Sequence, residues 1–175
     1  MKTKNPIQIA LTAVFASLYA VGVVFLAPIS FQIFQVRVAD ALLPLAMVFG
    51  WPAILGLSLG AFVANVFGGL GPIDMIGGAF ANFLATLIAW NIVTRKGRRW
   101  MLIGVGLEIL VITVVVGTYL SYLLAIPLTV SWLGIFLGSF AAIGILGSIL
   151  LYALSRRNVA VLMKSHGLST NKTEF

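Results

Sequence analysis

The sequence contains no cysteine, one histidine (His166) and only four acidic residues in 175. Without cysteine it can form no disulfide, thiolate nucleophile or cysteine-based metal site. His166 lies in a polar C-terminal stretch, far along the chain from the acidic residues that precede it. No histidine and carboxylate set therefore predicts a bound metal or acid–base catalysis. A membrane enzyme is accordingly the weakest functional alternative.

Charged residues are also scarce, at 9% of the chain, whereas 61% is hydrophobic and the mean hydropathy is +1.14. These values exclude an ordinary soluble domain. About 20 apolar residues are enough for a helix to cross the hydrocarbon core of a bilayer. The sequence predicts an all-α integral membrane protein, forming one membrane domain over residues 1–175. Its expected helices cover about 7–27, 39–49, 52–68, 73–93, 101–125 and 130–154, and a polar tail covers 157–175.

The formal net charge of +7 comes from basic residues at the predicted helix ends and in the tail. This distribution argues against nucleic acid as a partner and matches the excess of Lys and Arg in cytoplasmic loops. Six crossings with cytoplasmic N- and C-termini place 10 of the 11 Lys and Arg residues inside, leaving Arg37 outside. We therefore expect a multi-pass protein of the cell membrane in which the short segment 39–49 also crosses.

Polar residues recur between Gln32 and Asn82, in a region that is otherwise apolar. Buried polar groups are costly in a bilayer, so they are the first place to look for function. Asn65, Asp74 and Asn82 flank a glycine turn at 68–71, and we expect them to converge on an outward-opening substrate site. The alternative is that Asp74 only caps the following helix.

Arg37 and Asp40 are three residues apart at the outer start of the 39–49 helix. One interpretation is a local ion pair that orders the helix start. The other makes them part of a lid or pocket rim, together with Gln32 and Gln35 in the preceding external connection.

The helix expected at 101–125 adds three candidates for substrate binding. Glu108 is a single acidic residue in an apolar segment. It is protonated, paired with Arg98 or Arg99, or placed in a cavity. Tyr119 and Tyr122 are either interface anchors or ring-stacking partners for a flat ligand.

Small residues lie at three- and four-residue spacing on one face of the first helix, at Ala13, Ala16 and Ala20. Such faces allow close helix–helix approach in lipid. They serve either internal packing or docking of another membrane protein.

Three stretches of the sequence resemble one known family. Phe34 to Pro44, with its Arg37, Asp40 and Ala41-Leu42, is similar to the arginine–acid–Ala-Leu segment of the QueT family. Pro52 to Gly60 and Ala64 to Asp74 are similar to that family's glycine-bearing third helix, its Ala-Asn pair and its Gly-x-x-Asp turn. In one respect the chain departs from the family pattern: the acidic residue of the 101–125 helix is Glu108, not a residue near Gly117.

The resemblance implies an S component, the substrate-binding subunit of an energy-coupling factor (ECF) transporter. Its implied partners are a transmembrane scaffold (T) subunit, docked through Ala16-x-x-x-Ala20, and two cytoplasmic ATPase subunits. The implied cargo is a queuosine precursor of the 7-deazaguanine type, and no cofactor is expected. The alternatives are an S component for riboflavin, biotin or thiamin, and a membrane assembly subunit that carries no cargo.

Overall fold

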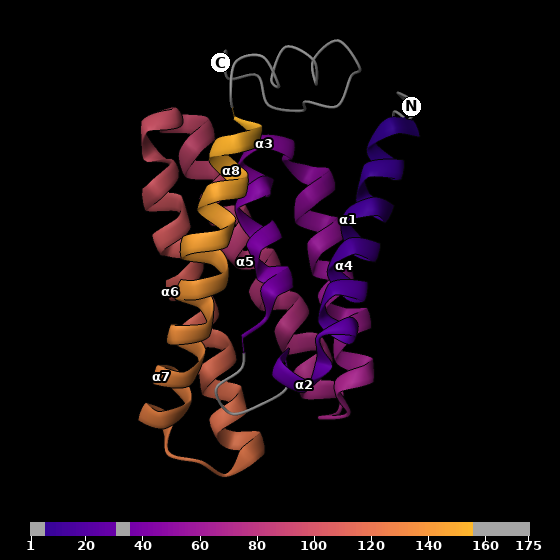
Figure 1. The fold of residues 1–175 in the computed structure, drawn as a ribbon, viewed down its shortest axis with the longest axis vertical. Helices are drawn as coiled ribbons and strands as arrows, with labels where there is room; N and C mark the ends of the chain where they lie inside the picture. Colours follow the sequence, from indigo (N-terminus) through magenta and orange to yellow (C-terminus); the bar gives the residue numbers. More distant parts are fainter. Residues whose placement is uncertain (1–5, 31–35, 156–175) are drawn as a thin grey trace.

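The computed structural model describes residues 6–30 and 36–155, and every regular element within these ranges is a helix (Figure 1). The elements in chain order are α1 (Pro6–Phe25), α2 (Ala27–Ser30), η1 (Val38–Leu45), α3 (Ala46–Phe49), α4 (Trp51–Gly68), α5 (Pro72–Lys96), η2 (Arg98–Trp100), α6 (Met101–Leu124), α7 (Leu128–Ser139), η3 (Phe140–Gly147) and α8 (Ser148–Leu154).

These helices confirm the all-α prediction, with ends close to those expected. Within the described residues, five helical stretches are long and apolar enough to cross a membrane. They are α1, α4, α5, η2 with α6, and the continuous run of α7, η3 and α8. The segment Val38–Phe49 is a shorter apolar helix and falls below that length.

The segment Val38–Phe49 also differs in kind from the single helix expected there. Its first eight residues form the 3₁₀-helix η1, which includes Pro44, and the α-helical part begins only at Ala46. A 3₁₀-helix rises about 2 Å per residue against 1.5 Å in an α-helix. Twelve residues in this mixed form therefore reach about 22 Å. Most of the segment is buried among the longer helices.

The two ends of the bundle differ in composition. α1 begins and α8 ends at the same end, where the loop between α5 and α6 also lies (Figure 1). Four basic residues lie around that connection: Arg95 and Lys96 at the end of α5, and Arg98 and Arg99 in η2. The Gly69–Gly71 turn between α4 and α5 lies at the opposite end (Figure 1). Gly69 and Gly71 have φ of 72° and 89°, a region that favours glycine.

Glycine also brings α1 and α4 into close contact. A Cβ at Gly56 would lie 2.6 Å from the Thr12 carbonyl oxygen, and one at Gly60 would lie 2.7 Å from the Ala16 carbonyl oxygen. Only Phe15, Tyr19 and Val23 of α1 are buried. α1 is thus a peripheral helix, held along one side by α4 and by η1.

Candidate substrate site

Three of the four acidic residues of the chain are buried inside the bundle. Asp40 in η1, Asp74 in α5 and Glu108 in α6 are 4%, 0% and 0% exposed. Arg37, immediately before η1, is also buried and lies close enough to Asp40 and Asp74 for electrostatic attraction to both. Ionisable groups inside a membrane protein mark functional sites by default. We call these four residues, together with Tyr19, Asn65, Asn82 and Tyr119, the polar cluster.

Asp74 is held by contacts from two neighbouring helices. The Tyr119 hydroxyl donates to Asp74 Oδ1 at 2.9 Å, and Asn65 Nδ2 donates to the Asp74 backbone oxygen at 2.8 Å. Gly71 precedes α5 as its N-cap, and no side chain forms a cap hydrogen bond there. The structure therefore does not support the interpretation of Asp74 as a helix cap. It does bring Asn65, Asp74 and Tyr119 together.

Two glycines of α5 make this arrangement possible, and sequence reasoning overlooked both. A Cβ at Gly77 would lie 2.9 Å from Tyr119 Cε1. A Cβ at Gly78 would lie 2.3 Å from Asn65 Nδ2 and 3.5 Å from the Tyr119 hydroxyl oxygen. The bare backbone of α5 thus provides the space in which both side chains reach Asp74.

Substituting Gly78 tests this packing. We expect Gly78→Ala to force Asn65 away from Asp74 and to lower the free energy of unfolding by about 1–3 kcal/mol, because a buried hydrogen bond is lost. The measurement is thermal unfolding of the purified protein in detergent. Gly106→Ala is the matched control, since a Cβ at that α6 position would meet nothing within 4 Å. Equal unfolding temperatures for the two variants would contradict the packing argument.

Tyr19 is the member of the cluster that the sequence did not reveal. Its hydroxyl donates to Asp40 Oδ1 at 2.5 Å, and the side chain is fully buried. Tyrosines in membrane helices are commonly interface anchors, so a tyrosine in the middle of the most exposed helix gave no signal. With this bond, Arg37 and Asp40 form part of a buried network and not an isolated local pair.

A small cavity lies inside the bundle, among residues of η1, α5, α6 and α7. It holds about 10 Å³ and is lined by Arg37, Asp40, Asn82, Ile112, Val116, Ile135 and Ser139. That volume is about the size needed for a single water molecule. Asn82 lies two helical turns beyond Asp74 on α5, and its Nδ2 also donates to the Leu57 carbonyl oxygen at 3.3 Å. Asn82 thus lines the same cavity as Arg37 and Asp40.

Glu108 lies one helical turn before Ile112 on α6 and has Asp40 as an electrostatic neighbour. Neither of its carboxyl oxygens has a hydrogen-bond partner. The alternative of a pairing with Arg98 or Arg99 is therefore not what the structure contains. Glu108 instead is fully buried in the interior, with Asp40 as its charged neighbour.

Several hydrogen-bond acceptors of the cluster are unpaired. Among the described residues, buried Asp74 Oδ2, Asn65 Oδ1 and both Glu108 oxygens lack hydrogen-bond partners. Leaving such groups buried and unpaired costs about 1–3 kcal/mol each. The cluster can offset that cost by binding a molecule that presents N–H or O–H donors.

Comparison with known proteins identifies the family. The family model described as "QueT transporter" matches residues 9–156, which is most of the chain. The chain belongs to the QueT transporter family. No curated protein and no solved structure matches it. Membership makes this a membrane transport protein, and the polar cluster lies in the part of the chain that the family model covers.

Not every predicted residue of this QueT protein reaches the cluster. Tyr122 is 79% exposed on α6, so the structure does not bring it together with the other predicted site residues. Tyr119 and Tyr122 are three residues apart, and only Tyr119 turns inward. Gln32 and Gln35 lie outside the described residues. Within the described residues, no three His, Cys, Asp or Glu side chains gather closely enough to hold a metal ion.

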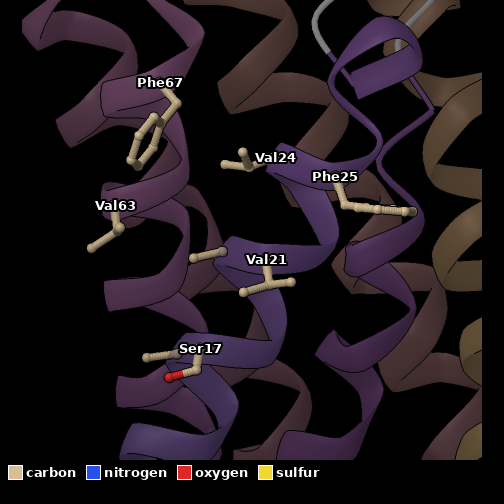
Figure 2. A pocket seen from close by; sticks show the side chains of 8 residues that line it. Ser17, Val21, Val24, Phe25, Val63 and Phe67 are labelled. Atoms are coloured by element: carbon tan, nitrogen blue, oxygen red, sulfur yellow. The ribbon is translucent and has the colours of Figure 1, made fainter.

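Two apolar grooves flank α1 of the QueT protein, on the surface between α1 and α4. Figure 2 shows one of them, lined by Val63 and Phe67 of α4 and by residues of α1 that include Ser17, Val21 and Val24. It encloses about 510 Å³, and Ser17 is its one polar lining residue. The second, of about 470 Å³, lies along Thr12, Ala13 and Ala16. Ala13 is exposed, and Ala16 and Ala20 are half-buried. The predicted docking residues thus lie at the surface, beside hollows wide enough for bulky side chains.

Proposed function

We propose that this QueT protein is the S component of an ECF-type importer and binds a queuosine precursor of the 7-deazaguanine type at the polar cluster. The observation that carries the proposal is the set of unpaired buried acceptors, Asp74 Oδ2, Asn65 Oδ1 and the Glu108 carboxyl oxygens. A 7-deazaguanine presents adjacent N–H donors on its pairing edge, and a carboxylate accepts two such donors at once. These unpaired acceptors complement the donor edge of this cargo.

Each part of the cluster has a role in this proposal. Asp74 or Glu108 accepts the paired N–H donors of the cargo. Asn65 and Asn82 read other polar atoms of the ring system, and Tyr119 packs against its face. Arg37 supplies the donor that a carbonyl oxygen on the heterocycle requires. Because the cavity holds only about 10 Å³, we infer that the apolar wall of Ile112, Val116 and Ile135 separates from Arg37 and Asp40 as the cargo enters.

The proposed topology places the cluster toward the external face. In it, Val38–Phe49 makes a sixth crossing, and both termini and the basic α5–α6 loop are cytoplasmic, in agreement with the positive-inside rule. In support, α1 begins and α8 ends at the end of the bundle that carries this loop (Figure 1). Asp40 and Asp74 lie near the starts of η1 and α5, toward the other end. Cargo would therefore enter from outside.

The proposed partners are a transmembrane scaffold (T) subunit and two cytoplasmic ATPase subunits. The grooves beside α1 suit the scaffold, because small residues let a partner helix approach closely within the bilayer. Energy from ATP would come from the ATPase subunits. The surface formed by Ala13, Ala16, Ala20 and the two flanking grooves is called the docking face below.

A ligand panel tests the cargo assignment. Purified protein in nanodiscs is titrated with 7-aminomethyl-7-deazaguanine, 7-cyano-7-deazaguanine, riboflavin, biotin and thiamin. We expect saturable binding of a deazaguanine with a dissociation constant in the micromolar range or tighter, and none of the vitamins. Tight binding of a vitamin with no deazaguanine binding would instead assign the protein as an S component for that vitamin. A protein that binds none of them, although folded, would favour an assembly subunit.

A further inference from the structure

The docking face and the polar cluster lie on opposite sides of α1. The side chain of Tyr19, on α1, links them. Tyr19 is three residues after Ala16 and one before Ala20, both of which line the groove of Figure 2. The backbone there faces α4, whereas the Tyr19 hydroxyl reaches Asp40 at 2.5 Å. Asp40 in turn lines the cavity of the polar cluster.

Close packing leaves Tyr19 little room to adjust independently of α1. A Cβ at Gly60 of α4 would lie 2.8 Å from Tyr19 Cβ and 3.2 Å from Ala16 Cα. The Tyr19 side chain is fully buried. A shift or rotation of α1 against α4 therefore moves the phenol ring, since no gap exists to absorb the displacement.

A second contact joins α1 to η1 at the same level. A Cβ on Gly22 would lie 3.3 Å from Ala39 Cβ, so α1 passes close to η1 beside Asp40. Arg37 lies only three residues before Asp40 in this tightly turned stretch, and the Asp40 amide donates to the Arg37 carbonyl oxygen at 2.9 Å. Displacing Asp40 consequently changes the position of Arg37, the neighbour of Asp74.

We propose that Tyr19 is a positioning residue that couples docking on the outer side of α1 to cargo affinity in the polar cluster. This inference rests on the proposed transport function. In the undocked protein, the Tyr19–Asp40 hydrogen bond holds Arg37 and Asp40 in the arrangement that binds cargo. A partner pressed against Ala16 and Ala20 shifts α1, disturbs that bond and lowers cargo affinity. Such a link is a coupling free energy between two sites, which typically changes affinity 5- to 150-fold.

The test is the ratio of two dissociation constants for one probe, tritiated 7-aminomethyl-7-deazaguanine. One is measured for the solitary protein and the other for its complete complex with the scaffold and ATPase subunits, both in nanodiscs. For the wild-type protein we expect affinity to be at least about fivefold weaker in the complex. For Tyr19→Phe, which keeps the ring and removes the hydroxyl, we expect the two values to agree within about twofold.

Tyr119→Phe is the matched control, because it removes a second tyrosine–aspartate hydrogen bond that does not involve α1. It should weaken binding by the same factor in both states and preserve the wild-type ratio. Asp40→Asn, which keeps a weaker neutral acceptor for Tyr19, should give an intermediate ratio and serves if Tyr19→Phe does not fold.

The outcomes separate the inference from the function on which it rests. A wild-type ratio near one, or an unchanged ratio in Tyr19→Phe, would overturn the coupling role while leaving cargo binding intact. A wild-type protein that does not bind the probe at all would overturn the proposed function, and the coupling role with it. If the ratio of the two dissociation constants also fell to about one in Tyr119→Phe, the coupling would belong to the cluster as a whole. That result would also overturn the role of Tyr19.

Discussion

Asp74→Asn is expected to weaken cargo binding by about 100-fold or more with little change in folding. The substitution is isosteric and leaves an oxygen that can still accept the 2.9 Å hydrogen bond from Tyr119. It replaces the unpaired Oδ2 with an NH₂ group, which opposes an N–H donor on the cargo. Removing one partner of a buried, charge-assisted hydrogen bond costs about 2–5 kcal/mol. The measurement is equilibrium binding of the deazaguanine by the purified protein.

The control for this prediction is Tyr122→Phe, because the Tyr122 side chain is 79% exposed and lies away from the cluster. The affinity of the Tyr122→Phe variant for the deazaguanine should match that of the wild-type protein. Thermal unfolding in detergent should show all three proteins folded. A folded Asp74→Asn variant with wild-type affinity would remove Asp74 from the site and leave Glu108 as the carboxylate that reads the cargo.

Ala16→Trp, alone or with Ala20→Trp, is expected to abolish uptake while leaving cargo binding within about twofold. An indole at Ala16 occupies the open grooves that this residue lines, and in the solitary protein no partner presses on α1. Neither position belongs to the polar cluster. The indole prevents a helix of the scaffold subunit from approaching α1 closely, and this removes the packing that drives helix association in lipid. Uptake is measured in proteoliposomes that contain all subunits, and cargo binding is measured on the solitary protein.

Leu18→Trp provides the matched control for the docking prediction. Leu18 lies on α1 between Ala16 and Ala20 and is 54% exposed, and it lines neither groove. Uptake by this variant should be close to that of the wild-type protein. If Ala16→Trp and Leu18→Trp inhibited uptake equally, bulk on α1 and not the docking face would be responsible. Loss of cargo binding in Ala16→Trp would instead assign Ala16 to internal packing.

The long helices were predictable because their apolar length is recorded directly in the sequence. The meeting of Asn65 and Asp74 was also predictable, since nine residues separate them across a turn with two glycines. The conformation of Val38–Phe49 was not. A long 3₁₀-helix is uncommon, and here it exists because surrounding helices bury nearly all of it. Such tertiary effects leave no local pattern.

Tyr19 and Tyr122 show where sequence reasoning about the site fails. Both are tyrosines in apolar helices, and the type of residue alone does not tell which one turns inward. The rotation of α1 is fixed by Gly56 and Gly60 of another helix, and the packing of Tyr119 by Gly77 and Gly78 of α5. These glycines were visible in the sequence, but their partners were not.

The central claim is that cargo binds at the polar cluster and not in the larger apolar grooves beside α1. A cryo-EM or crystal structure of the protein with bound 7-deazaguanine cargo tests it directly. The account predicts the heterocycle among Arg37, Asp74 and Asn82, with an N–H donor about 3 Å from Asp74 Oδ2 or a Glu108 oxygen. Cargo density in the groove between Ala16 and Phe67, with the polar cluster unchanged, would contradict it.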